Sequence, residues 1–253
     1  MVDIDKRLQN HEIISFDIFD TLIRRTVSRP AKVFDLVEKD YLSIYGEETI
    51  ADFSRRRTEA ERKARSLKKT EITLEDVYSS FEGDYPESVF ERYRRIEERV
   101  EMKVCVKNEP VFRIYQECLR QNKRIIVISD MYLSRDVIEM ILKKNDYQEY
   151  SELYVSSELG HTKMKGSLFD YVLSRERITA RELLHIGDNP FSDIRNARIR
   201  GIAACQVKPA KDNVCKCGLA SAENRDSILQ GFFSHSDDPT EDVFRQIGYR
   251  CFG

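Results

Sequence analysis

The sequence predicts an α/β fold, a Rossmann-like doubly wound parallel sheet with an inserted domain of α-helices. Short apolar runs rich in β-branched residues recur at 13–16, 124–128, 153–155, 183–186 and 202–207. Continuous apolarity without alternation is typical of strands that are buried on both faces of a parallel sheet. Apolar residues at helical spacing fill the intervals between the later runs, which indicates repeated strand, helix, strand units.

A long interval with almost no strand signal separates the first run from the second. Its apolar residues keep helical spacing, and the candidate helices are 31–42, 50–67, 74–81 and 86–104, followed by 110–120 on the way back to the sheet. We therefore predict an α/β core from 1–24 and 108–220, a helical cap over 25–107, and a C-terminal helical extension over 221–253. That extension either leads into further domains of a longer parent chain or is a natural end.

Composition bounds the function. The chain has 253 residues, of which 41% are hydrophobic and 34% charged, as in ordinary globular proteins. With 42 Lys and Arg against 44 Asp and Glu, no long-range field favours nucleic acid or an anionic membrane. No apolar run approaches the roughly 18 residues of a membrane span, and the N-terminus lacks the apolar core of a secretory signal. These features predict a cytoplasmic protein.

Acidic residues follow the apolar runs where strands of the predicted sheet end. Asp17 comes directly after the first run, and Asp188 and Asp193 follow the fourth. In an open parallel sheet the carboxyl ends of the strands surround the ligand site. Carboxylate oxygens suit Mg²⁺, so these three residues predict a magnesium site in which one carboxylate can double as nucleophile.

Two further residues complete this predicted site. The Ser129 hydroxyl, after the second run, and the Lys163 ammonium, before the fourth, can hold phosphoryl oxygens. Each residue alone has a structural interpretation, since Asp and Ser at strand ends often cap helices or form turns. The joint pattern favours chemistry, because several separate strand ends supply complementary groups.

At these residues the sequence resembles the haloacid dehalogenase superfamily, in particular members with a helical cap after the first motif. SFDIFDTL, VISD, Lys163 within KMKGSLF, and HIGDNPFSD resemble its four motifs in the expected order. The resemblance implies that Asp17 attacks phosphorus and forms an aspartyl phosphate, which water then hydrolyses. It also implies Mg²⁺ binding by Asp17, Asp188 and the Phe19 carbonyl, with Asp193 supporting the metal or Lys163.

One position departs from the family pattern. Phosphatases of the superfamily usually have a second Asp two residues after the nucleophile as general acid and base, and here that residue is Phe19. Proton transfer of this kind contributes about 10²- to 10⁴-fold in rate. Asp20, Asp130 or the substrate can supply the missing acid, or the ligand has a good leaving group. Alternatively, the chain binds a phosphorylated ligand without turnover, or is a dehalogenase, although dehalogenases need no cation.

The remaining predictions concern the ligand, a small phosphorylated metabolite. Thr21, Ser129, Asp130 and Lys163 are its expected contacts in the core. In the cap, Arg57 and Arg65 could grip a second anionic group, and the alternative is a solvated helix face with glutamate partners. SFDIFDTL, SDMYLS and the GSLFDYV stretch resemble a bacterial subgroup associated with surface-polysaccharide synthesis, which implies a sugar phosphate or nucleotide-linked sugar.

Overall fold

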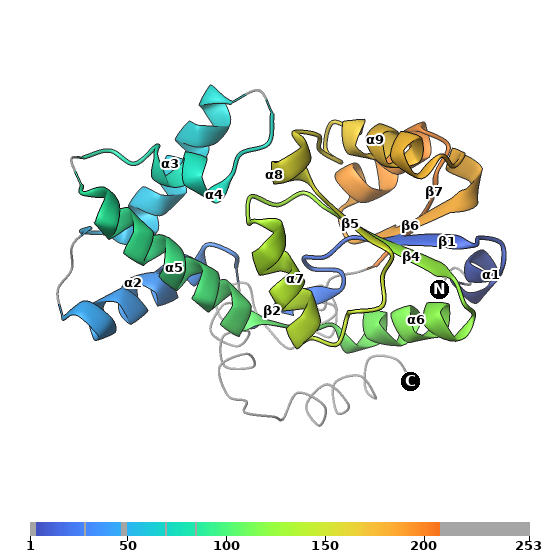
Figure 1. The fold of residues 1–253 in the computed structure, drawn as a ribbon, viewed down its shortest axis with the longest axis horizontal. Helices are drawn as coiled ribbons and strands as arrows, with labels where there is room; N and C mark the ends of the chain where they lie inside the picture. The colour runs from blue at the N-terminus through green and yellow to red at the C-terminus, as the bar shows by residue number, and fades with distance from the viewer. Residues whose placement is uncertain (1–3, 28, 47–49, 69, 84, 208–253) are drawn as a thin grey trace, which may run out of the picture.

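The computed structural model describes residues 4–27, 29–46, 50–68, 70–83 and 85–207. Its centre is a parallel sheet of five strands in the order β5-β4-β1-β6-β7 (Figure 1). The strands are β1 Ile13–Phe16, β4 Arg124–Ser129, β5 Glu152–Val155, β6 Leu183–Gly187 and β7 Ala203–Gln206. The predicted fold class is confirmed. The extension predicted over 221–253 lies outside the described residues.

The strand order reverses at β1. From β1 the chain adds β4 and then β5 on one side, and it later returns to add β6 and β7 on the other. A crevice opens where neighbouring connections leave in opposite directions, and α/β proteins of this type bind ligands there. Asp17 follows β1 directly, so the fold places this carboxylate at the reversal point.

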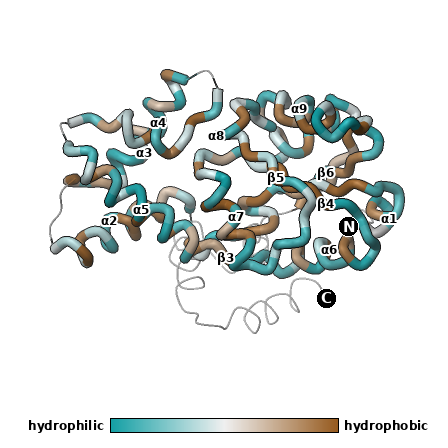
Figure 2. The backbone as a smooth tube through the Cα atoms, in the orientation of Figure 1, coloured by the Kyte–Doolittle hydropathy of each residue, from teal (hydrophilic) through white to brown (hydrophobic). Residues whose placement is uncertain are grey.

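Helices cover both faces of the sheet and bury two apolar clusters. Ile14 and Phe16 pack in one cluster with α6 (Glu109–Arg120) and α7 (Arg135–Lys144). Ile13 packs in the other with α9 (Ser167–Glu176) and α10 (Asn196–Ile199). Figure 1 shows α6 and α7 on one side of the strands and α9 on the other, and the strands are largely brown in Figure 2. Alternating side chains of each strand therefore enter different cores.

The remaining short helices are α1 (Ile4–Gln9), α8 (Ser156–Leu159) and a single 3₁₀ turn (Ala180–Glu182). Among the described residues, no helix combines the length and apolarity needed to cross a membrane.

Four helices form a separate layer beside the sheet, which we call the cap. They are α2 (Lys32–Tyr45), α3 (Phe53–Leu67), α4 (Leu74–Tyr78) and α5 (Glu87–Val104), at the left in Figure 1. Stacked aromatic rings hold them together, since Tyr93 lies 3.8 Å from Tyr41 and 4.3 Å from Phe53 between ring centroids. Such rings bury large apolar areas and add stability through their stacking.

A pair of short strands carries the chain into and out of the cap. β2 (Ile23–Arg25) and β3 (Cys105–Lys107) are antiparallel, with Arg25 opposite Cys105. The cap also contacts the core at the loop after β4, where the Leu74 amide donates to the Tyr132 carbonyl at 3.0 Å. Entry and exit strands therefore lie next to each other and beside motif one.

Candidate active site

Three carboxylates converge at the carboxyl ends of β1 and β6. One oxygen from each of Asp17, Asp188 and Asp193 lies within 4.8 Å of the others. The Asp17 amide donates to the Ile186 carbonyl at 2.9 Å, which continues the pairing of β1 with β6 and fixes where the Asp17 side chain begins. An oxygen-only donor set of this size suits a hard divalent cation such as Mg²⁺.

The Lys163 ammonium lies between two of these carboxylates. Its Nζ is 2.5 Å from Asp17 Oδ1 and 2.6 Å from Asp193 Oδ1, and its side chain is 2% exposed. Asn196 helps to hold the loop, because its side-chain amide donates to the carbonyls of Lys163 and Met164. If all three carboxylates are ionised, Lys163 leaves a net charge of two negative units, which a bound divalent cation would balance.

Asp193 is the most constrained of the three carboxylates. Its Oδ2 accepts from the Asn189 amide at 2.9 Å, and a Cβ added to Gly187 would lie 2.5 Å from its Cγ. The turn Pro190–Arg195 is wide, since the Ile194 amide reaches the Asn189 carbonyl five residues back. Such turns are rare and often occur at functional sites. Only glycine at 187 leaves room for this carboxylate.

Burial and neighbouring charges raise the pKa values of two of these carboxylates and lower that of the third. Burial, together with Asp193 and Asp188, raises the pKa of Asp17 despite the nearby Lys163. Burial would also raise the pKa of Asp193, but Lys163 and His185 outweigh it and hold that pKa below the ordinary range. Burial, then Asp20 and Asp193, raises the pKa of Asp188 to about 6. A bound cation would favour the ionised form of all three.

Two buried hydroxyls, on Ser129 and Thr21, find no partner within the described part of the chain. Neither Ser129 Oγ nor Thr21 Oγ1 makes a hydrogen bond there, although Ser129 is 1% exposed and Thr21 fully buried. Buried polar groups are almost always paired, so an orphaned hydroxyl calls for a ligand or water. Both residues are expected substrate contacts, and their unused hydrogen-bonding capacity fits that expectation.

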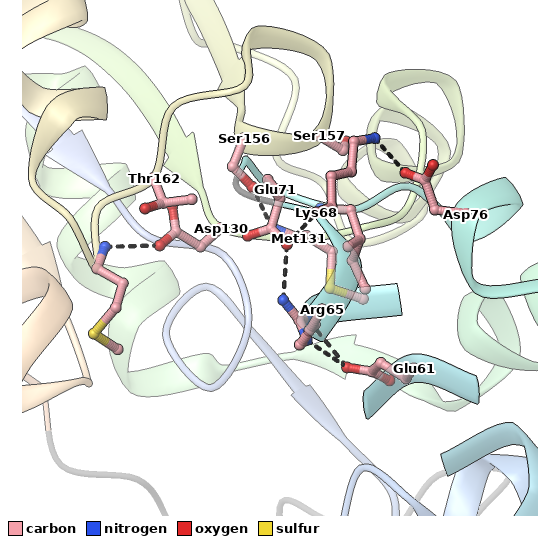
Figure 3. A network of polar contacts seen from close by, with 12 residues as sticks. Glu61, Arg65, Lys68, Glu71, Asp76, Asp130, Met131, Ser156, Ser157 and Thr162 are labelled. Atoms are coloured by element: carbon pink, nitrogen blue, oxygen red, sulfur yellow. Dashed lines mark hydrogen bonds and ion pairs between the residues drawn. The ribbon is translucent and has the colours of Figure 1, made fainter. Parts of the chain in front are cut away.

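Asp130 is already engaged by the loop that carries Lys163. Its two carboxylate oxygens accept from the backbone amides of Lys163 at 2.7 Å and Met164 at 3.0 Å. Figure 3 shows Asp130 directed at this loop, beside Thr162. The structure therefore gives Asp130 a contact that positions the loop of motif three.

The structure does not bring Arg57 to the carboxylate cluster. Its side chain is 0% exposed, donates to both oxygens of Glu97 at 2.6 and 2.8 Å, and packs over Phe34 and Tyr132. The guanidinium is fully used inside the cap and at its contact with the core. No face of it is open to a ligand.

Arg65 is more open but also paired. Its side chain is 47% exposed and donates to Glu61 and to Glu71. Figure 3 shows Arg65 and Glu71 beside Met131, in the loop that follows Asp130. The cap thus presents a charged pair close to motif two.

Motif one ends in an unusual backbone turn. Asp20 has φ of 61°, a left-handed conformation uncommon for residues other than glycine. Asp20 is close enough to Asp188 to contribute to its raised pKa. The ring of Phe19 is instead covered by the guanidinium of Arg25, 4.5 Å from its centroid. Asp20, and not Phe19, is therefore the residue at the end of motif one whose charge acts on the carboxylate cluster.

Sequence reasoning missed His185 and Gly187 as parts of the site. His185 is fully buried, and its Nε2 lies 3.3 Å from Asp193 Oδ1. Burial lowers its pKa, although Asp193 opposes this shift. The available signal was a histidine inside an otherwise apolar run, two residues before the glycine of motif four.

The sheet order and the carboxylate cluster at its reversal point define an α/β protein equipped for hydrolase chemistry. The chain belongs to the haloacid dehalogenase-like hydrolase family, whose model matches residues 3–207. No curated protein matches the sequence.

Several solved structures share the fold. A putative hydrolase of this family from Bacillus subtilis, YfnB, bound to magnesium, matches with TM-score 0.55 and 16% identity over 78% of this chain and 89% of that one. A predicted phosphoglycolate phosphatase from Haemophilus somnus gives 0.53 and 14% over 79% and 86%. A 2-haloacid dehalogenase from Pseudomonas syringae gives 0.51 and 17% over 78% and 86%. At these identities the likeness concerns the fold.

Proposed function

We propose that this chain is a Mg²⁺-dependent phosphohydrolase that acts on a small phosphorylated metabolite. The observation that carries the proposal is the arrangement of Asp17, Asp188 and Asp193 within 4.8 Å of one another, with Lys163 bound to two of them. The three carboxylates offer only oxygen ligands, and when ionised they carry two more negative charges than Lys163 neutralises. Such a set is suited to one hard divalent cation. The orphaned hydroxyls of Ser129 and Thr21 are suited to phosphoryl oxygens.

In this proposal Asp17 is the nucleophile. One of its oxygens bonds to phosphorus while the bond from phosphorus to the leaving oxygen breaks, which gives an aspartyl phosphate. Water then attacks this phosphorus and regenerates Asp17 and inorganic phosphate. Lys163 and Ser129 hold the phosphoryl oxygens, and Asp193 keeps Lys163 in place. The metal, held by Asp17, Asp188 and the Phe19 carbonyl with support from Asp193, supplies Lewis-acid stabilisation of the transferred group when bound.

The proton for the leaving oxygen is the open step. Phe19 has no acidic proton, and Asp130 is occupied by two backbone amides. Asp20 is the remaining candidate for the proton donor, because it is close enough to Asp188 for its charge to raise the pKa of that residue. We infer that Asp20 or the substrate supplies this proton, or that the substrate has a good leaving group.

A second candidate is a phosphate-binding domain without turnover, and Phe19 is the observation that favours it. A carbon-halogen hydrolase is the third candidate, and the retained acidic cluster argues against it. The sugar-phosphate class and a role in polysaccharide synthesis rest on the resemblance of the motifs, and the cytoplasmic location on composition.

The test is phosphate release from sugar phosphates, nucleotides and acyl phosphates, with Mg²⁺ or with chelator. Asp17→Asn should abolish release, whereas Asp136→Asn, the same change at an exposed position of α7, should not. Activity that survives Asp17→Asn would exclude the nucleophile assignment. Phosphate binding without any turnover would favour the second candidate, and chloride release that is insensitive to chelator would favour the third.

A further inference from the structure

A buried polar chain lies directly behind the carboxylate cluster. Ser15 of β1 and His185 of β6 are register partners in the sheet, and both are 0% exposed. Both point to the face that α9 covers, among aliphatic neighbours such as Ile13 and Leu183. A polar pair in such a position costs stability unless each atom finds a partner.

The hydrogen bonds identify which nitrogen of His185 carries the proton. Ser15 Oγ is 2.8 Å from His185 Nδ1 and 3.5 Å from the Leu184 carbonyl. A serine hydroxyl has one proton. Donated to the Leu184 carbonyl, it would leave Ser15 to accept from a protonated Nδ1, and donated to the nearer Nδ1, it leaves the ring proton on Nε2. The contact of Nε2 with Asp193 decides between these two arrangements, in favour of a proton on Nε2.

That proton points at Asp193. His185 Nε2 lies 3.3 Å from Asp193 Oδ1, the oxygen that also accepts from Lys163 at 2.6 Å. A lone pair on Nε2 would instead face a carboxylate oxygen and repel it. On its other side the ring packs edge-to-face against Phe169, with 4.9 Å between the ring centroids and 77° between the planes.

We propose that His185 is a positioning residue for Asp193, with Ser15 fixing its Nε2–H tautomer. Asp193 has donors on both oxygens, from Asn189 on one side and from His185 and Lys163 on the other. Together they prevent the carboxylate from rotating, so that it holds Lys163 against Asp17. In its consequence for catalysis and metal binding, this inference rests on the proposed function.

A merely structural role predicts something different. If His185 only filled space between β6 and α9, any side chain of similar size would serve, and the position of its proton would not matter. If it positions Asp193, a replacement must donate from the place of Nε2. Glutamine can reach that place with its side-chain amide, whereas the shorter asparagine cannot.

The first measurement uses the unaltered protein. Long-range ¹H–¹⁵N NMR of histidine-labelled protein should show His185 protonated on Nε2 and unprotonated on Nδ1. A ring protonated on Nδ1, alone or together with Nε2, would overturn the proposal. This measurement needs neither metal nor substrate.

The second measurement compares His185→Gln with His185→Asn. Groups that orient metal ligands typically contribute about 10- to 100-fold to affinity or activity. We expect His185→Asn to lose that much in Mg²⁺ affinity by calorimetry and in kcat for phosphate release, and His185→Gln to stay within a few-fold of the original. Equal values for two folded variants would overturn the proposal.

Controls separate packing from hydrogen bonding. Phe169→Leu removes the ring contact without touching the chain of hydrogen bonds. It should lower the melting temperature and leave the Mg²⁺ affinity within a few-fold of the original. Ser15→Ala removes the partner of Nδ1 and should raise the share of the Nδ1–H tautomer above that in the unaltered protein, while the Asp193 contact continues to favour Nε2–H. Should the protein bind Mg²⁺ with the expected tautomer yet hydrolyse no phosphate ester, the proposed function fails and the role of His185 in the site stands.

Discussion

The guanidinium of Arg25 lies 4.5 Å from the centroid of the Phe19 ring, and it also forms a bidentate ion pair with Glu101. Phe19 stands two residues after Asp17, where the resemblance of motif one leads us to expect a proton-transferring Asp, and the contact joins this position to the strand that enters the cap. A cation over an aromatic face stabilises the pair by about 0.5–2 kcal/mol. The Phe19 ring is therefore held by a residue of β2, the strand that enters the cap.

Phe19→Asp should raise phosphatase activity. The charge of Arg25 is already offset by Glu101, so a carboxyl introduced at this position is not held ionised by an unpaired cation. We expect kcat to increase for alkyl phosphates, up to about 10²- to 10⁴-fold, and much less for aryl phosphates with good leaving groups. Phe19→Asn is the matched control, and an equal gain from it would show that proton transfer is not the cause.

Lys163→Met should destabilise the metal-free protein. Removing the ammonium leaves Asp17 and Asp193 facing each other in a buried site, and breaking a buried ion pair in this way typically costs about 3–5 kcal/mol. Urea unfolding without metal should show this loss, and added Mg²⁺ should recover part of it. Lys143→Met, at an exposed position of α7, should change little. Equal effects of the two changes would contradict the central place of Lys163.

Asp188 should make the metal-free protein less stable as pH rises. The pKa of Asp188 in the folded protein, about 6, lies above the ordinary value of 3.8, so the folded state binds this proton more tightly than the unfolded chain does. The contribution of protonated Asp188 to the free energy of unfolding is complete below about pH 4 and is lost as pH rises through 6. The difference in unfolding free energy between the unaltered protein and Asp188→Asn should therefore shrink or reverse across this window. A difference that is flat with pH would refute the shift.

Arg57→Met should unfold the cap rather than weaken ligand binding. The change leaves Glu97 buried without its bidentate partner, at a typical cost of about 3–5 kcal/mol. Combining it with Glu97→Gln, which keeps an acceptor for the Tyr78 hydroxyl, should restore much of the loss in a double-mutant cycle. Arg55→Met, on the exposed side of the same helix, should leave stability nearly unchanged. A higher KM with unaltered melting would instead restore Arg57 as a ligand contact.

Much of the fold was predictable because strands and helices leave local patterns. The run at 13–16 coincides with β1, and the run at 183–186 falls short of β6 by one residue. The pair β2 and β3 was missed, because three residues each give no periodicity. Carboxylates at strand ends were predicted since parallel topology brings such ends together.

The remaining site depends on long-range partners that spacing does not reveal. The arginines of α3 look alike in sequence, yet Arg57 is fully buried because Glu97, 40 residues away, faces it. Asp130, which we expect at the substrate, also accepts from the amides of the Lys163 loop, a contact that spacing did not reveal. His185 was overlooked because its partners come from β1 and from the turn after β6.

The antiparallel pairing of Arg25 with Cys105 means that the cap leaves the core and returns to it at a single point. Antiparallel neighbours need only a two-residue turn to join them. The segment 26–104 is thus an insertion between two neighbouring strands, and it does not interrupt the order of the five strands of the sheet. Its helices nevertheless share one apolar cluster with the core, so the inserted layer and the sheet are packed as one body.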